Sequence, residues 1–225
     1  MSEILSGLNV ATVALWAARL MILFGSIILH EVSHGYAAYL LGDPTAKRMG
    51  RLTLNPVKHV DPFGTIIMPA AMLLLSGGSF AFGYAKPVPF DPRYFKNERK
   101  GMLITGIAGP ASNILIALVC GIILRITLAF ASASSAFLTV VVGLLYYAVI
   151  INLILAFFNL IPIPPLDGSR VVQRFLPRKA RDAYHQLEPY GFVIVIAISW
   201  LLPAVFDTYL NLTALPLATI FTGIH

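Results

Sequence analysis

The residues most able to do chemistry form an H-E-x-x-H sequence from His30 to His34, inside an apolar run from Leu20 to Leu41. Two histidines four residues apart lie on one face of an α-helix, so both can bind one metal ion. Glu31, between them, is placed to handle a proton. An ionisable side chain in an apolar helix costs about 2.5–3.5 kcal/mol on insertion scales, so three polar groups in five residues indicate a function. The alternative is a polar patch that faces a neighbouring helix.

A catalytic zinc ion commonly takes three protein ligands and leaves a fourth position for water. Cys120 is the only cysteine and lies in an apolar run, so the third ligand must be a histidine or a carboxylate. Asp167 is the best candidate, because it is embedded in apolar sequence and the prolines around it could turn its carboxylate inward. The alternative is an ordinary turn at Asp167-Gly168 that precedes a helix.

Composition indicates a polytopic membrane protein. The 225 residues are 58% hydrophobic and 12% charged, about half the usual charge content of ~25%, and several apolar runs approach the ~20 residues that span a bilayer. No secretory signal pattern precedes the first run, and no repeat divides the chain, so residues 1–225 are expected to form a single integral membrane domain. The net charge of +6 is explained by basic loops, and no nucleic-acid partner is expected.

The elements that must position these residues are about four to six membrane segments in an all-α chain. Helical spans are expected over about 20–41, 102–130 and 137–161, and residues 1–19 are expected at a membrane interface. A last apolar stretch begins near Tyr190 and is interrupted by Pro203, and whether residues 204–225 re-enter the bilayer is left open. Residues 47–56 are expected to form a strand and turn, and residues 169–188 a short surface helix.

Basic residues predict the orientation. Of sixteen Lys and Arg residues, four lie in 47–58, five in 86–100 and five in 170–181, so all three segments are expected to be cytoplasmic. Residues 63–85 must then begin and end on the same side. Their apolar run of 13 residues is too short for one crossing, so we expect a re-entrant β-hairpin region near the active site, which opens toward the cytoplasm.

The motifs resemble those of the site-2 protease family of intramembrane metalloproteases. The resemblance rests on H-E-x-x-H in one membrane helix, on Gly109-Pro110-Ala111-Ser112-Asn113, and on Asn159-x-x-Pro162 leading to Leu166-Asp167-Gly168, and it covers about residues 25–170. Gly50 to Pro56 and His59 to Gly64 resemble the compact members without PDZ or CBS domains. The resemblance implies one zinc ion per chain, held by His30, His34 and Asp167, with Glu31 as general base.

The resemblance also implies substrates and further site residues. Asn113 resembles the family's asparagine and is a candidate oxyanion donor; alternatively it makes a hydrogen bond between helices. The substrates are expected to be single-pass membrane proteins, cleaved in or near their transmembrane segments in a cell membrane whose lipids surround the enzyme. The scissile segment must unwind, and an edge strand could pair with it, either in 48–54 or in 80–90. The substrate-binding candidates in the second strand are Phe80, Ala81, Phe82, Gly83 and Tyr84.

Two other functions fit some of these residues. In an ion or metal transporter, His30, Glu31, His34 and Asp167 would line an ion path, but the sequence lacks the repeated broken-helix pattern that transporters often show. In a catalytically inactive scaffold that binds membrane helices, Glu31 would have no role.

Overall fold

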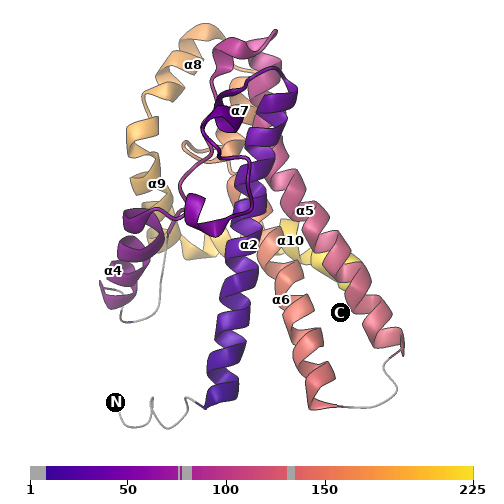
Figure 1. Ribbon diagram of the computed structural model, residues 1–225. Coiled ribbons are helices and arrows are strands. Elements are labelled where there is room, and N and C mark those ends of the chain that lie inside the picture. The colour runs from indigo at the N-terminus through magenta and orange to yellow at the C-terminus, as the bar shows by residue number, and fades with distance from the viewer. Residues whose placement is uncertain (1–8, 76, 78–82, 131–134, 225) are drawn as a thin grey trace.

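Four long helices dominate the computed structural model, which describes residues 9–75, 77, 83–130 and 135–224 (Figure 1). They are α2 (Val10–Leu40), α5 (Glu98–Phe130), α6 (Ala136–Asn159) and α10 (Pro203–Thr222), and each is long and apolar enough to cross a membrane. Many of their large apolar side chains are exposed, as expected of surfaces that face lipid. The predicted all-α, multi-span architecture is therefore confirmed in its main features.

Helix α2 begins ten residues before the predicted start of the first span. Asn9 caps it, because its side-chain oxygen accepts a hydrogen bond of 2.8 Å from the Thr12 N–H. Arg19, which we placed at an interface, lies within the helix. Its guanidinium carbon is 5.5 Å from the centre of the Trp16 ring and 5.6 Å from that of Tyr147. These aromatic faces reduce the cost of carrying a cation on an apolar helix.

The helices pack through small residues and through polar bonds. A buried cluster joins α5, α6 and α10, and its members are Ala117, Val149, Leu153, Ala214 and Ala218. Helix α2 packs against α5 and α6. Asn152 of α6 donates a 2.9 Å hydrogen bond to Ser26 Oγ of α2. In lipid such a bond contributes about 0.6–2 kcal/mol, so it helps to fix α2 against α6.

The predicted break after the third span is also present. Helix α6 ends at Asn159, and residues 160–166 form an irregular loop before α7 (Asp167–Gln173). A Cβ on Gly168 would lie 2.2 Å from the carbonyl oxygen of Leu160, so a glycine is needed for α7 to pack back on this loop. Asp167 thus becomes the first residue of a short helix that turns back toward α2 and α5.

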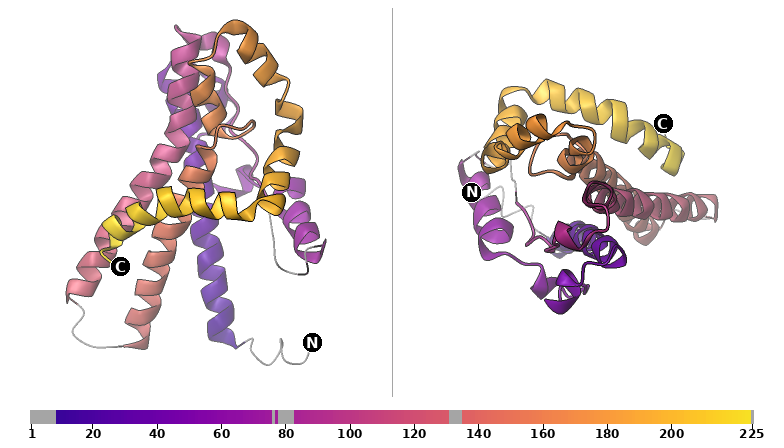
Figure 2. Two further views of the ribbon diagram at one scale, coloured as in Figure 1. Left: turned by 180° about the vertical axis from the view of Figure 1, so that it is seen from behind. Right: turned by 90° about the horizontal axis from the view of Figure 1, so that it is seen from above.

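The basic segments lie at one end of the bundle. Figure 1 places the carboxyl end of α2, the amino end of α5, α7 and α8 (Arg178–His185) together, opposite the amino ends of α2 and α6. Helix α9 (Glu188–Leu201) leads back from that end to α10. In Figure 2, α10 runs across α5 and α6 rather than along them. Residues 204–222, whose return to the bilayer was left open, belong to this apolar helix.

The predicted re-entrant β-hairpin is not found, since no strand occurs in the ranges that the structure describes. Residues Pro62–Ile67 form the π-helical turn η2, and Met68–Leu75 form helix α4. Asp61 starts this helical run, because its carboxylate accepts hydrogen bonds from the N–H groups of Phe63 and Gly64. A capping aspartate followed by proline thus favours a helix start over the turn of a hairpin.

Of the strand and turn predicted over 47–56, the turn is present at Met49 and Gly50, but the strand is wrong for a similar reason. Residues Thr45–Arg48 form the short helix α3, and Pro56–Lys58 form the 3-10 turn η1. Gly50 ends α3 with a φ of 63°, and Asn55 caps η1 by accepting a hydrogen bond from Val57 N–H. The apparent alternation of the sequence came from these capping residues rather than from a pleated strand.

Residues 83–91, which we call the strap, have no regular secondary structure and pair with no strand among the described residues. The N–H of Tyr84 donates to the carbonyl of Gly64 at 3.0 Å, and that of Lys86 donates to the carbonyl of His59 at 2.9 Å. Pro87 and Pro89 have no N–H to donate, which prevents a regular ladder. The strap therefore runs from η2 toward the HExxH helix, tied by single hydrogen bonds.

Candidate metal centre

His30 and His34 lie on the buried face of α2, one turn apart, as their spacing predicts. Their rings are edge to face, with centres 4.6 Å apart and planes at 84°. The two Nε2 atoms are 3.0 Å apart. The helix alone therefore brings two metal-binding nitrogens to one point.

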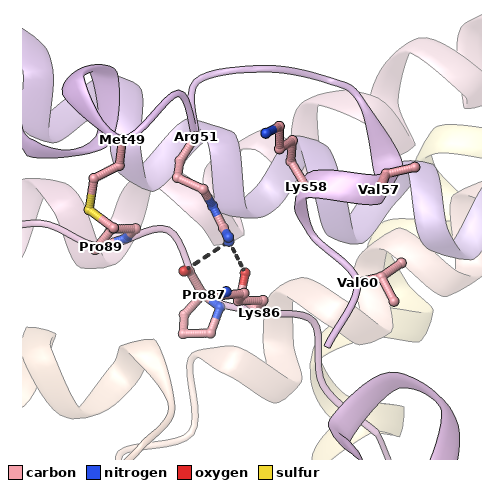
Figure 3. Close-up of a pocket in the computed structure, with 8 residues that line it drawn as sticks. All are labelled: Met49, Arg51, Val57, Lys58, Val60, Lys86, Pro87 and Pro89. Atoms are coloured by element: carbon pink, nitrogen blue, oxygen red, sulfur yellow. Dashed lines mark hydrogen bonds between the residues drawn. The ribbon is translucent and has the colours of Figure 1, made fainter. Parts of the chain in front are cut away.

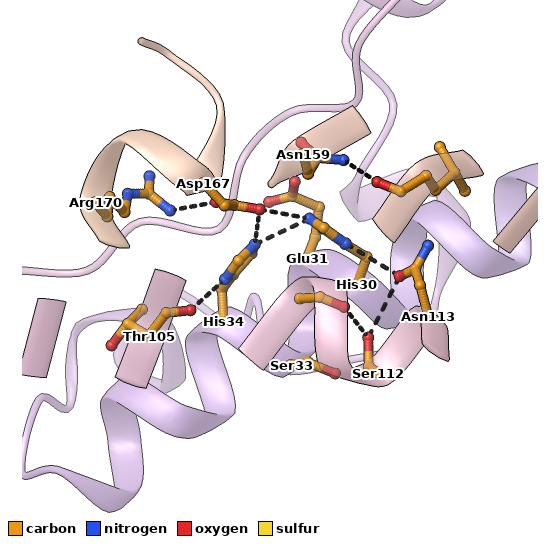
Figure 4. A network of polar contacts seen from close by, with 12 residues as sticks. His30, Glu31, Ser33, His34, Thr105, Ser112, Asn113, Asn159, Asp167 and Arg170 are labelled. Atoms are coloured by element: carbon orange, nitrogen blue, oxygen red, sulfur yellow. Dashed lines mark hydrogen bonds and ion pairs between the residues drawn. The ribbon is translucent and has the colours of Figure 1, made fainter. Parts of the chain in front are cut away.

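Asp167 completes a cluster of three (Figure 4). Its Oδ2 lies 3.0 Å from His30 Nε2 and 3.1 Å from His34 Nε2. Within the described part of the chain, these side chains form the one group of three that could hold a metal ion. Zinc bonds of about 2.0–2.1 Å at tetrahedral angles place the ligand atoms about 3.3 Å apart. The cluster is therefore close to the geometry that zinc requires.

The hydrogen bonds around the cluster test whether a cation fits. His30 Nδ1 lies 3.0 Å from Asn113 Oδ1, and His34 Nδ1 lies 2.6 Å from the carbonyl oxygen of Thr105. Both partners are acceptors, so each Nδ1 carries the ring hydrogen and each Nε2 presents a lone pair. Two lone pairs and a carboxylate oxygen then meet in a buried space. These electron-rich atoms repel one another unless a cation lies between them. Two imidazole nitrogens and a carboxylate oxygen are common zinc ligands, so a zinc ion fits this space.

Asp167 is held in turn by Arg170, one turn further along α7. The Arg170 guanidinium donates to Asp167 Oδ1 at 2.7 Å and also lies over the ring of Phe90 in the strap, 5.0 Å from its centre. Burial tends to raise the pKa of the Asp167 carboxyl, but the two imidazoles and the charge of Arg170 lower it below the usual value for an aspartate. The residue is therefore a carboxylate, with Oδ2 left for the metal.

Glu31 is tied to the strap rather than to the histidines. Its Oε2 accepts a hydrogen bond of 3.0 Å from the N–H of Val88. Gly35, one turn further along α2, allows this approach, because a Cβ there would lie 2.5 Å from Cγ1 of Val88. Figure 4 shows the Glu31 carboxylate beside the Asp167–His30 pair. The strap thus holds the carboxylate next to the cluster.

Asn113 reaches the site through its oxygen. The hydrogen bond that we weighed between helices is present, and its partner is His30 itself. The amide nitrogen of Asn113 is buried and has no hydrogen-bond partner among the described residues. Asn113 therefore orients a predicted ligand while one of its donors stays unused.

Two groups that shape the site were not predicted from the sequence. The Thr105 carbonyl that holds His34 is a backbone group, so no residue type announces it. Gly109 entered the sequence analysis only as part of a motif, but the pair of imidazoles packs against it. A Cβ at Gly109 would lie 2.3 Å from His34 Nε2 and 2.6 Å from His30 Cε1. The small residue on α5 therefore makes room for the ligand rings of α2.

The predicted substrate-binding residues are only partly visible. Phe80, Ala81 and Phe82 lie outside the described residues. Gly83 and Tyr84 begin the strap and contact η2 and α4, since Tyr84 bonds to Gly64 and a Cβ on Gly83 would lie 2.5 Å from Pro69. The structure leaves their part in substrate binding a prediction.

Comparison with known proteins agrees with the metal cluster. The model of Peptidase family M50 matches residues 125–202, which include Asp167. YwhC of Bacillus subtilis, named as a zinc metalloprotease, is 40% identical over 174 residues, or 77% of this chain and 75% of YwhC. Rip2 of Mycolicibacterium smegmatis, named in the same way, is 30% identical over 77% of this chain and 62% of Rip2.

A third relative is a zinc metalloprotease of Methanocaldococcus jannaschii. It is 30% identical over 73% of this chain, which spans only 36% of that protein. No solved structure matches the chain at a significant level. The names of the relatives favour the protease over the transporter that we also considered.

Proposed function

Because the chain belongs to peptidase family M50, the site-2 protease family, and is thus a zinc metalloprotease, we propose that it cleaves membrane proteins in or near their transmembrane segments. Single-pass membrane proteins are the proposed substrates, and regulated intramembrane proteolysis is the proposed process. The observation that carries the proposal is the convergence of His30, His34 and Asp167 on α2 and α7, in a helical chain with four apolar helices.

We assign one zinc ion per chain to these three residues. Zinc bound there would lower the pKa of a water molecule toward neutrality and polarise the substrate carbonyl. Glu31 accepts the proton of the attacking water and delivers it to the leaving amine. The bond from Val88 N–H supports this role, because it holds one carboxylate oxygen and leaves the other for the water.

Asn113 is the second catalytic residue that we propose. Its oxygen is engaged by His30, while its amide nitrogen is buried with no partner in the described chain. A fixed donor in a water-poor site stabilises a developing oxyanion better than water does, since it needs no reorientation during the reaction. Asn113 would thus orient one ligand and stabilise the transition state.

The proposed route of the substrate follows the strap. We keep residues 80–84 as its contact, because this segment precedes Val88, the residue of the strap that bonds to Glu31. Pro87 and Pro89 lack N–H groups, so main-chain pairing with an unwound substrate is confined to the residues before them. His30 lies ten residues before the end of α2, about 15 Å along the helix. If the basic segments lie on the cytoplasmic side of a cell membrane, the site would open toward the cytoplasm.

The test is cleavage in a defined membrane. Purified chain is reconstituted in liposomes with a single-pass substrate, and the products are located by mass spectrometry. We expect cuts within or beside the transmembrane segment by the native protein and none by Glu31→Gln, which should still bind zinc and trap substrate. His185→Ala, at an exposed histidine outside the cluster, is the matched control and should cleave normally. Equal cleavage by Glu31→Gln would overturn the proposal.

A further inference from the structure

A hollow of about 490 Å³ lies beside the strap and shares no lining residue with the metal cluster (Figure 3). It is formed by η1, by the loop that precedes η1, and by the strap. The side chains that matter here are of two kinds, three cations and three apolar residues. They are Arg51, Lys58 and Lys86, and Met49, Val57 and Val60.

The cationic residues indicate an anionic ligand. None of the described residues that line the hollow is acidic. Arg51 is only 6% exposed, and one end of its guanidinium donates to the carbonyls of Lys86 and Pro87 at 2.7 and 3.1 Å. Its Nε is buried without a hydrogen-bond partner among the described residues. A buried guanidinium with an unused donor beside two lysines is suited to a phosphate oxygen.

The apolar residues place the hollow at a membrane surface. Val57 and Met49 are 77% and 61% exposed at the rim of this charged hollow. The chain enters η2 two residues after Val60, and η2 exposes Phe63, Ile66 and Ile67. Apolar surface of this kind belongs in lipid. The phosphate that reaches the hollow is therefore one whose acyl chains lie beside η2.

We propose that this hollow binds the phosphate headgroup of an anionic membrane lipid. Basic pockets at the cytoplasmic edge of membrane segments suit such headgroups, and each nearby Lys or Arg strengthens the attraction. Arg51 and the two lysines hold the phosphate, while Met49, Val57 and Val60 contact the glycerol and the first methylenes of the chains.

The site is connected to Glu31 through the strap. Arg51 holds the carbonyls of Lys86 and Pro87, and the next residue, Val88, donates its N–H to Glu31. A phosphate on Arg51 and Lys86 fastens the strap at this point. Bound lipid thereby steadies the carboxylate beside the metal cluster without touching it, which makes the lysines positioning residues for the proposed hydrolysis.

Lipid retention by the full chain tests the site without relying on proteolysis. The detergent-purified protein is offered equal amounts of phosphatidylglycerol and phosphatidylcholine, and bound lipid is counted by native mass spectrometry. We expect a preference for phosphatidylglycerol that falls about tenfold or more in Lys58→Gln/Lys86→Gln, because two charges are lost. The matched control is Lys96→Gln/Lys179→Gln, which removes two exposed basic charges outside the hollow. It should keep the preference, and thermal unfolding should be unchanged in both.

Three results would overturn the proposal. The preference could persist in Lys58→Gln/Lys86→Gln, or both double variants could lose it equally, which would indicate diffuse attraction. Alternatively, excess soluble glycerol phosphate could displace the lipid fully, which would indicate a site for free phosphate. The connection to Glu31 predicts that phosphatidylglycerol in liposomes raises cleavage by the native protein but not by the lysine variant. An equal response of both would refute the connection, even where lipid retention differs.

Discussion

At the scale of single residues, each predicted ligand of the cluster is held by a partner, and only some of these contacts could be predicted from the sequence. The i, i+4 spacing of His30 and His34 predicted that their rings share a face, because helix geometry alone determines it. Asp167 was predictable from its apolar surroundings and the prolines before it. The hydrogen-bond acceptor for His34 was not predictable, because it is the backbone carbonyl of Thr105 and every residue type has a backbone carbonyl.

Gly109→Ala should disturb the cluster without altering any ligand. The added methyl would meet both imidazoles at 2.3–2.6 Å, closer than atoms in contact can lie. We expect zinc content and cleavage to fall together, as measured by metal analysis and substrate assay. Gly143→Ala is the control, because nothing lies within 4 Å of a Cβ there. Normal zinc content in Gly109→Ala would mean that the rings have more room than the structure indicates.

Asn113→Ala separates the two roles of the amide. If its oxygen orients His30, zinc affinity should fall about 10–100-fold, as is usual when a partner of a metal ligand is removed. Competition with a zinc chelator measures this affinity. Asn159→Ala removes an amide that, among the described residues, bonds to Leu155 in its own helix, and it should leave zinc affinity unchanged. A slower reaction with unchanged zinc affinity in Asn113→Ala would leave only the oxyanion role.

At the scale of elements, the main lesson comes from the segment between α2 and α5. Alternating apolar residues suggested strands, but Asp61, Asn55 and Gly50 cap helical turns instead. The strap has no regular secondary structure, and its N–H groups bond to separate acceptors rather than to a partner strand among the described residues. Sequence periodicity could not reveal this, because it depends on which distant groups reach the strap.

Val88→Pro tests whether the strap holds Glu31. The substitution removes the N–H that bonds to Oε2 and changes no metal ligand. We expect cleavage to fall at least about tenfold, the usual effect of losing a positioning contact of more than 1.4 kcal/mol, with zinc content unchanged. Val88→Thr keeps both the N–H and the side-chain shape and should cleave nearly normally. If proline at this position leaves cleavage intact, Glu31 does not depend on the strap.

At the scale of the whole molecule, hydropathy located three of the long helices but did not predict the fourth or how the helices are arranged. Three spans occur close to the expected positions, and α10 adds a fourth apolar helix. That α10 runs across α5 and α6 depends on the packing of Ala214 and Ala218 against the bundle, which an apolar stretch does not encode. The carboxyl end of α2 and the amino end of α5 lie with α7 and α8 at one end of the bundle, which agrees with the predicted orientation.

Cysteine labelling tests that orientation. Cys120 is first replaced by serine, because it is the only native cysteine. Cysteines at Lys47, Lys96 or Lys179 should then react with a membrane-impermeant reagent from the cytoplasmic side, because all three lie in the basic segments. A cysteine at Ala136, at the amino end of α6, should react from the side of the membrane that faces away from the cytoplasm. Labelling of the Lys96 position from outside the cell would require residues 62–91 to cross the membrane.

The central claim is that three side chains from α2 and α7 hold one catalytic zinc ion, and metal content per chain tests it most directly. We predict about one zinc in the native protein, in Glu31→Gln and in His185→Ala, and little or none in His30→Ala, His34→Ala or Asp167→Ala. Equal thermal unfolding of the variants in excess chelator would show that the difference lies in the metal site. Full zinc occupancy in Asp167→Ala would contradict the account, because the third ligand would then lie elsewhere.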